Sequence, residues 1–205
     1  MCGRFKLTKK QQEVIDRYNA EVERLFEELT NASPTQNLPV ITNEKPGQIQ
    51  FFRWGLVPYW AKELTIGNKM FNARAETIRE KPSFKIPFQR RRCLVPADGF
   101  YEWKKVEGGK KQPYVITLKS EEIFSFAGLW DVWKNPDGNL INSFTIITTS
   151  PNSLMEDIHD RMPVILKQED EKVWLNNNTN AETVFSLLKP FHADEMKIEM
   201  ISKVG

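Results

Sequence analysis

The sequence predicts a single-domain α+β fold, with a mostly antiparallel, barrel-like β-sheet, an N-terminal helix and a few short helices. After residue 40 the chain consists largely of short runs rich in Phe, Trp, Ile and Val, which is typical of strands. Helical periodicity is confined to an early segment and a few short stretches. No repeat, low-complexity segment or linker divides the 205 residues, so we expect residues 1–205 to form one domain.

The first element predicted along the chain is an amphipathic helix. Thr8 is followed three residues later by Gln11, which is a capping-box pattern. Apolar residues then recur at helical spacing up to about residue 29. Pro34 ends this pattern and begins a polar loop that we expect to run through Pro39.

The remaining elements are mainly strands joined by tight turns. The predicted strands cover residues 48–57, 93–103, 113–119, 122–133 and 141–149. Gly108-Gly109 and Pro136-Asp137-Gly138-Asn139 lie between such runs and predict hairpin turns. Short helices are expected at 152–159, 169–175 and 181–189, followed by a closing strand over residues 196–201.

Composition limits the class of protein. The net charge of +2 does not by itself indicate a nucleic-acid partner, so any basic surface must come from local clustering. Two cysteines do not make a disulfide framework and suit a reducing compartment. The N-terminus lacks the apolar segment of a signal peptide, and the apolar runs are too short to cross a bilayer. We therefore expect an intracellular protein with no membrane partner, and a monomer is the default expectation.

Cys2 carries unusual chemistry if Met1 is removed. The residue would then hold a free α-amine, with a pKa near 7.7–8.0, beside a thiol with a pKa near 8.5. The amine can condense with an aldehyde to give an imine, and the thiol can then close a five-membered ring on the imine carbon. An internal cysteine cannot form this ring.

Four polar, irregular segments resemble those of a known family. They read MCGRF at the start, FNARAET from Phe71, PADGFYEWKK from Pro96 and IHDRMPV from Ile158. In this order they are similar to the motifs of the SRAP family, the SOS response-associated peptidases. The resemblance extends over residues 2–163, and the tail beyond about residue 165 contributes no diagnostic motif.

The resemblance implies a protein of the DNA damage and SOS response that acts on abasic sites in single-stranded DNA. A cytoplasmic, nucleoid-associated location follows from this implied role. Family members form a thiazolidine crosslink between the N-terminal cysteine and the ring-opened sugar. They are also credited with removing their own initiator methionine. The matching active-site residues are Cys2, Asn72, Glu102 and His159, with no cofactor. A weak lyase activity is expected if imine hydrolysis or β-elimination outruns ring closure.

Side-chain chemistry suggests a role for each residue. Glu102 is the natural acid and base, particularly if its aromatic neighbours raise its pKa by desolvation. His159 can protonate the sugar hydroxyl, and Asn72 can orient the sugar or the cysteine terminus. From the residues alone the alternatives stay open: Glu102 could face water, His159 could be a surface histidine and Asn72 a turn residue.

DNA-binding candidates come from the same motifs. Arg4, Arg74 and Arg161 each lie within two residues of an active-site position. Trp54 and Trp103 could stack on bases, although core packing is the favoured alternative for Trp54. A contact from Pro39 with the strand junction rests on the resemblance alone. The basic runs at 90–92, 104–105 and 110–111 could contact phosphates or simply be solvated.

Two other classes of protein were considered. Cys2-Gly3 also resembles the start of an N-terminal-nucleophile amidohydrolase or glutamine amidotransferase, but no glutamine-binding arginine or oxyanion-hole motif is identified. A noncatalytic single-strand-binding module would not explain Cys2 or Glu102. A metal site is not expected, because Cys2, Cys93, His159 and His192 lack ligand-pair spacing. Cys93 is instead expected to be a small buried apolar residue.

Overall fold

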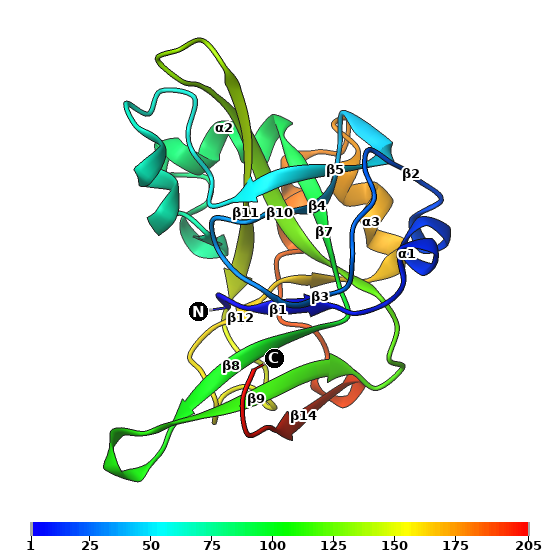
Figure 1. Ribbon diagram of the computed structural model, residues 1–205, viewed down its shortest axis with the longest axis vertical. Coiled ribbons are helices and arrows are strands. Elements are labelled where there is room, and N and C mark those ends of the chain that lie inside the picture. Colours follow the sequence, from blue (N-terminus) through cyan, green and yellow to red (C-terminus); the bar gives the residue numbers. More distant parts are fainter. Residues whose placement is uncertain (1, 205) are drawn as a thin grey trace.

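The computed structural model describes residues 2–204 and shows two β-sheets with helices around the larger one (Figure 1). The larger sheet has the order β12-β11-β10-β7-β4-β5-β2, and β5 also pairs with β11 in parallel, so that five strands close into a ring. Its strands are β2 (Glu21–Val22), β4 (Asn37–Thr42), β5 (Lys45–Trp54), β7 (Arg92–Ala97), β10 (Phe124–Lys134), β11 (Leu140–Thr149) and β12 (Met162–Pro163), with β6 (Asn72–Arg74) and β13 (Ile165–Leu166) attached. The predicted α+β fold with a barrel-like sheet is confirmed.

The smaller sheet positions the N-terminus. Its order is β14-β9-β8-β1-β3, formed by β14 (Met196–Met200), β9 (Lys111–Leu118), β8 (Gly99–Lys105), β1 (Phe5–Leu7) and β3 (Leu29–Ala32). Gly108 and Gly109 turn the chain between β8 and β9 with φ values of 77° and 75°, which a side chain would disfavour. This hairpin, the β10–β11 hairpin and the closing strand β14 are confirmed as predicted.

The helices are short and lie mainly against the larger sheet. The α-helices are α1 (Gln11–Tyr18), α2 (Pro82–Arg90), α3 (Gln168–Leu175) and α4 (Ala181–Ser186), and the 3₁₀ helices are η1 (Leu64–Lys69), η2 (Ala75–Thr77), η3 (Glu107–Gly109) and η4 (Ala193–Glu195). Helix α2 was not predicted, because Pro87 in its interior argues against a helix. Phe84 and Phe88, one helical turn apart, are buried and hold it on the sheet.

The early helix is much shorter than predicted. It ends at Tyr18, where Asn19 adopts a left-handed conformation with φ 46°. Val22, Phe26 and Leu29 then pack against the core from extended segments, and Leu25 is exposed, so the spacing of these residues does not indicate a helix. The Thr8 cap was also wrong, because the Thr8 hydroxyl donates to Asp98 Oδ2 at 2.9 Å.

Two further expectations were wrong. The predicted helix end is occupied by β3, and the predicted polar loop runs into β4, in which Pro39 is buried opposite Phe51. Residues 152–159 form consecutive turns and not a helix. The Asn152 side chain accepts hydrogen bonds from the backbone N–H groups of Leu154 and Met155, which competes with helical hydrogen bonding.

Two apolar clusters make up the core. One joins inward-facing residues of both sheets and includes Cys2, Phe5, Phe126 and Phe144. The other joins the helices to the larger sheet and includes Trp174 of α3. No helix within residues 2–204 is long and apolar enough to span a membrane.

Candidate active site

Cys2 is held beside strand β8 by the pairing of β1. Phe5 lies opposite Phe100, and the Tyr101 amide donates to the carbonyl of Arg4 at 2.9 Å. Continuing this antiparallel register brings the residues before β1 alongside the Glu102 end of β8. Cys2 is fully buried, and its Sγ lies 3.8 Å from the carbonyl oxygen of Arg4.

Glu102 and Cys2 form a coupled pair of acids. Glu102 is 2% exposed, and burial raises the pKa of its carboxyl to about 7, although a hydrogen bond with the Trp103 backbone acts in the opposite direction. Burial also raises the pKa of the Cys2 thiol well above its ordinary value, and the charge of Glu102 raises it further. Ionised Glu102 therefore disfavours ionisation of the Cys2 thiol, and Glu102 can both accept and donate a proton near neutrality.

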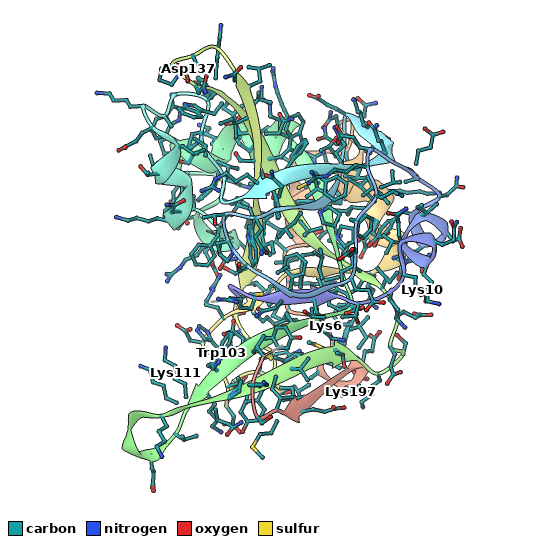
Figure 2. The ribbon with its side chains drawn as sticks, in the orientation of Figure 1. Lys6, Lys10, Trp103, Lys111, Asp137 and Lys197 are labelled. Carbon is teal, nitrogen blue, oxygen red and sulfur yellow. The ribbon has the colours of Figure 1, made fainter. Side chains whose placement is uncertain are left out.

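A cleft of about 560 Å³ opens at Glu102, while Cys2 is fully buried and does not line it. Glu102 and Trp103 line it from β8, His159 lines it from the turns before β12, and lysines of the β8–β9 hairpin line its outer part. Figure 2 shows Trp103 and Lys111 on the same side of the molecule, at the lower left. The cleft thus joins an acid/base group, a histidine, an aromatic ring and positive charge.

His159 is held as a neutral imidazole. Burial lowers its pKa, although the charge of Asp160 acts in the opposite direction. Its Nδ1 accepts a hydrogen bond from the Arg161 amide at 3.0 Å, so the neutral ring carries its proton on Nε2. The same Nδ1 lies 2.7 Å from Asp160 Oδ1, which becomes its partner if that nitrogen is protonated.

Asn72 lies half-buried at the start of β6. Its Nδ2 donates to the Ile146 carbonyl at 3.4 Å, while its buried Oδ1 accepts no hydrogen bond within residues 2–204. The preceding Phe71 packs on Trp54, with ring centroids 6.2 Å apart, and Trp54 packs on Phe5 at 5.2 Å. This aromatic series links β6 to β1, although Asn72 does not itself line the cleft.

Two of the predicted DNA-binding residues are not available at the surface. Trp54 is fully buried and donates its indole N–H to the Phe71 carbonyl at 2.8 Å, so the prediction that it stacks on bases is wrong. Pro39 is buried in β4, so it does not stand in a loop as expected. Trp103 is half-buried at the cleft, which leaves part of its ring accessible.

The predicted arginines differ in their surroundings. Arg4 donates to Asn31 Oδ1 at 2.8 Å, and Arg74 is exposed. Arg161 makes a two-pronged ion pair with Glu76, at 2.6 and 2.9 Å. This ion pair connects the segment that carries His159 to η2, and the carboxylate of Glu76 neutralises the positive charge of Arg161.

The three basic runs also differ. Arg92 is buried, and its guanidinium donates to the backbone carbonyls of Trp174 and Asn176 among others. Arg91 pairs with Asp131. The run at 90–92 is therefore largely structural, whereas Lys104, Lys105 and Lys111 line the cleft.

Sequence reasoning missed an exposed aromatic pair. Tyr59 is 62% exposed and Trp60 is 46% exposed, directly after Pro58. Trp60 borders a largely apolar hollow of about 620 Å³ together with Lys62 and Lys69. The pair could have been found from the sequence because it directly follows Pro58, where a turn leaves aromatic side chains with little sheet to pack against.

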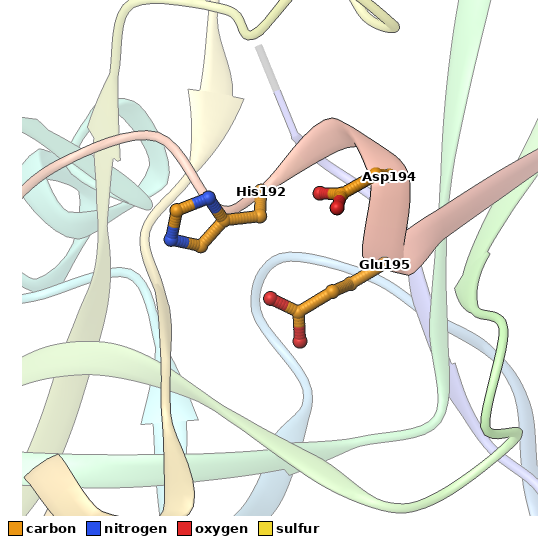
Figure 3. Close-up of side chains that lie close together, drawn as sticks. All are labelled: His192, Asp194 and Glu195. Atoms are coloured by element: carbon orange, nitrogen blue, oxygen red, sulfur yellow. The ribbon is translucent and has the colours of Figure 1, made fainter.

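One group of candidate metal ligands lies apart from the cleft. His192, Asp194 and Glu195 in and beside η4 bring their ligand atoms within 4.8 Å of one another (Figure 3). All three are exposed, and such groups are common without a metal ion. The two cysteines, by contrast, are buried and not joined to each other.

The barrel and the cleft define a class of protein: one that holds a cysteine near the N-terminus beside a buried, proton-exchanging glutamate. The family described as "SOS response associated peptidase (SRAP)" matches residues 1–204, and the chain belongs to this family. The match supports the resemblance seen in the sequence and not the amidotransferase alternative.

Named relatives and solved structures agree. The chain is 48% identical to abasic site processing protein YoqW of Bacillus subtilis, over 100% of this chain and 93% of that protein. It is 34% identical to abasic site processing protein HMCES of Rattus norvegicus, over 85% of this chain and 60% of that protein. A crystal structure of a protein from Bacteroides thetaiotaomicron superposes with a TM-score of 0.92, 37% identity and coverage of 98% and 92%. A second structure, from Bordetella bronchiseptica, has a TM-score of 0.86 and 25% identity, with coverage of 98% and 100%.

Proposed function

We propose that this chain processes abasic sites in single-stranded DNA by forming a covalent adduct through Cys2 after Met1 is removed. The proposal is supported by the family and by the names of its relatives. The observation that carries it is the burial of Cys2 beside Glu102, a carboxyl whose pKa of about 7 suits proton transfer at neutral pH. Met1 itself lies outside the described residues.

The order of steps follows from the raised pKa of the thiol. Because burial keeps the Cys2 thiol protonated, its α-amine attacks the sugar aldehyde first, in the neutral form that exists near its pKa of about 7.7–8.0. The carbinolamine then loses its hydroxyl as water, with Glu102 as the proton donor, and an imine forms. The thiol adds across the C=N bond, sulfur to carbon and proton to nitrogen, and one water molecule is released overall.

His159 and Asn72 are proposed to assist the sugar. The neutral His159 ring carries its proton on Nε2, which can donate to the sugar hydroxyl as the ring opens. The buried Oδ1 of Asn72 can accept a hydrogen bond from the sugar or from the Cys2 amine. Arg4, Arg74 and Trp103 are proposed to bind the flanking strand, and the exposed Tyr59 and Trp60 offer additional stacking surfaces.

Two finer activities belong to the same proposal. The chain would remove its own Met1 with Glu102 as general acid and base, and it would cleave the DNA weakly when the imine eliminates before the thiol adds. Intact mass tests the removal of Met1. Glu102→Gln should retain Met1 when expressed in cells lacking methionine aminopeptidase, whereas the parent protein should lose it. Strand cleavage that is undetectable even in Cys2→Ser, which lacks the trapping thiol, would rule out the lyase activity.

The test of the proposed function is a crosslinking assay with matched cysteine variants. The mature protein is incubated with single-stranded DNA containing one abasic site, and the products are separated on a denaturing gel. A retarded band is expected for the parent protein and for Cys93→Ala, because Cys93 is equally buried but internal. The band should be absent in Cys2→Ala, and its persistence there would refute the proposed chemistry.

A further inference from the structure

The β8–β9 hairpin extends beyond the smaller sheet as a two-stranded ribbon (Figure 1). Strand β1 pairs with Gly99 and Phe100 of β8, and β14 pairs with residues 114–118 of β9. Beyond these ladders the two strands pair with each other. A two-stranded ribbon is only marginally stable by itself, so its side-chain pairs matter for its stability.

The ribbon places like charges directly opposite each other. Lys105 of β8 pairs with Lys111 of β9, and Lys104 and Lys110 flank them. Like charges in this position destabilise a strand pair, whereas one glutamate or threonine would relieve the repulsion. Within residues 2–204, none of these four lysines forms a salt bridge.

The opposed lysines share a face of the ribbon with Trp103. Side chains two residues apart on a strand point to the same side, so Trp103 and Lys105 lie on one face, and Lys111 joins them from β9. All three line the cleft, which Glu102 and Lys104 line from the other face of β8 and His159 lines from the turns before β12. Trp103 lies nearer the acid/base residues, and the two lysines lie farther out along the ribbon.

We propose that the β8–β9 ribbon is a phosphate-binding arm, in which Lys105 and Lys111 contact the backbone of the DNA strand while Trp103 stacks on one of its bases. The inference rests on the proposed function, because it takes the occupant of the cleft to be a single strand of DNA. An aromatic ring beside paired cations is the arrangement that holds single strands without regard to sequence. Bound phosphate would also neutralise the repulsion that the opposed lysines create.

The salt dependence of binding tests the arm. The probe is a 20-nucleotide single strand that carries a tetrahydrofuran analogue of the abasic site, which has no aldehyde and cannot crosslink. Losing two phosphate contacts should reduce the slope of log K against log salt by about 1.4, since each single-strand contact contributes about 0.7. At 0.1 M salt, Lys105→Gln/Lys111→Gln should therefore bind about 25-fold more weakly, and Lys105→Arg/Lys111→Arg should bind like the parent.

A matched pair of exposed lysines on another face is the control. Lys81→Gln/Lys85→Gln removes the same charge at helix α2 and should keep the parent slope. The melting temperature of the ribbon variant should be unchanged or higher, because a like-charge repulsion is removed. A parent-like slope in the ribbon variant, or an equal loss in the control, would overturn the proposed arm.

The two proposals fail in different ways. Adduct formation by the parent protein with aldehyde-bearing DNA tests the proposed function, whereas the salt slope with the tetrahydrofuran probe tests the arm. If the parent forms no adduct, the proposed function fails while the salt slope still reports on the arm. If the adduct forms and the slope is unchanged by the ribbon variant, the arm alone is refuted.

Discussion

Two buried glutamates in this molecule are surrounded very differently. Glu171 of α3 accepts both prongs of the Arg17 guanidinium, at 3.1 and 2.9 Å, and a hydrogen bond from Ser125 at 2.6 Å. Glu102 of β8 is buried near the Cys2 thiol and Asp160, and the pKa of its carboxyl is raised to about 7. The ion pair of Glu171 with Arg17 fastens α1 to α3, whereas burial of Glu102 raises the pKa of its carboxyl and keeps a proton available near neutral pH. The first arrangement stabilises the fold and the second supplies chemistry.

The largest expected effect is on stability, at the structural glutamate. Glu171→Gln should lower the free energy of unfolding by about 3 kcal/mol, because the half-buried Arg17 would lose its charge partner. Urea denaturation at pH 7.5 measures the change. Adduct formation at 20 °C should be unaffected, and a parallel loss of crosslinking would mean that the two regions are not separable.

The opposite result is expected at Glu102. Glu102→Gln should slow adduct formation by about 100-fold, since a positioned acid or base contributes at least this much. The same variant should be more stable than the parent at pH 8 by up to about 3 kcal/mol, the free energy that corresponds to the difference between about 7 and the ordinary 4.5. Single-turnover gels and urea denaturation give both numbers. A variant that is both slower and less stable would indicate a structural role for this carboxyl.

The pH dependence of folding stability and of the crosslinking rate should both report on Glu102. The folded protein binds a proton at Glu102 that the unfolded chain has already released between pH 4.5 and about 7, so this group makes the fold less stable as the pH rises through that range. The rate of crosslinking should increase with pH as the α-amine loses its proton. It should decrease above about pH 7 as Glu102 loses its proton, by up to tenfold per pH unit. In Glu102→Gln the decrease should disappear. If the crosslinking rate of Glu102→Gln decreases at the same pH as that of the parent, another group is responsible for the decrease.

The smallest effect is expected at Glu76, a structural residue that holds the segment carrying His159. Glu76→Gln removes the partner of Arg161 and should loosen the segment that carries His159, slowing adduct formation by severalfold. Arg161 lowers the pKa of Glu76, so this contact is fully formed above the ordinary pKa of 4.5 and is lost on acidification below it. Rate measurements at pH 7.5 test the tether, and a parent-like rate would show that the segment is held by other contacts.

The strands were predictable because alternating or continuous apolar runs bounded by glycines identify them, as in β9, β10 and β11. Strand β4 escaped notice because Pro39 and the polar residues before it are typical of a loop. The long early helix was wrong because Val22, Phe26 and Leu29 pack against the core from extended segments that happen to follow helical spacing. Spacing alone does not show which partner an apolar side chain has.

For the site, the motifs supplied candidate catalytic residues, whose roles stay predictions, but they did not show which residues are accessible. The suitability of Glu102 as an acid and base was conditional on a pKa raised by desolvation, and burial raises its pKa to about 7. Trp54 and Trp103 both lie in aromatic strand segments of the sequence, yet Trp54 is fully buried in the core and Trp103 borders the cleft. The register that sets Lys105 opposite Lys111 depends on the length of the turn between them, which fixes β8 against β9.

The most direct test is to locate the adduct within the chain. Mature protein is reacted with abasic single-stranded DNA without any reductant, digested with trypsin and nuclease, and analysed by mass spectrometry. We predict a sugar remnant on the N-terminal peptide that begins at Cys2, with a mass that reflects the loss of one water molecule. A remnant at Cys93 or at a lysine, or an adduct that survives only after borohydride reduction, would contradict the proposed thiazolidine.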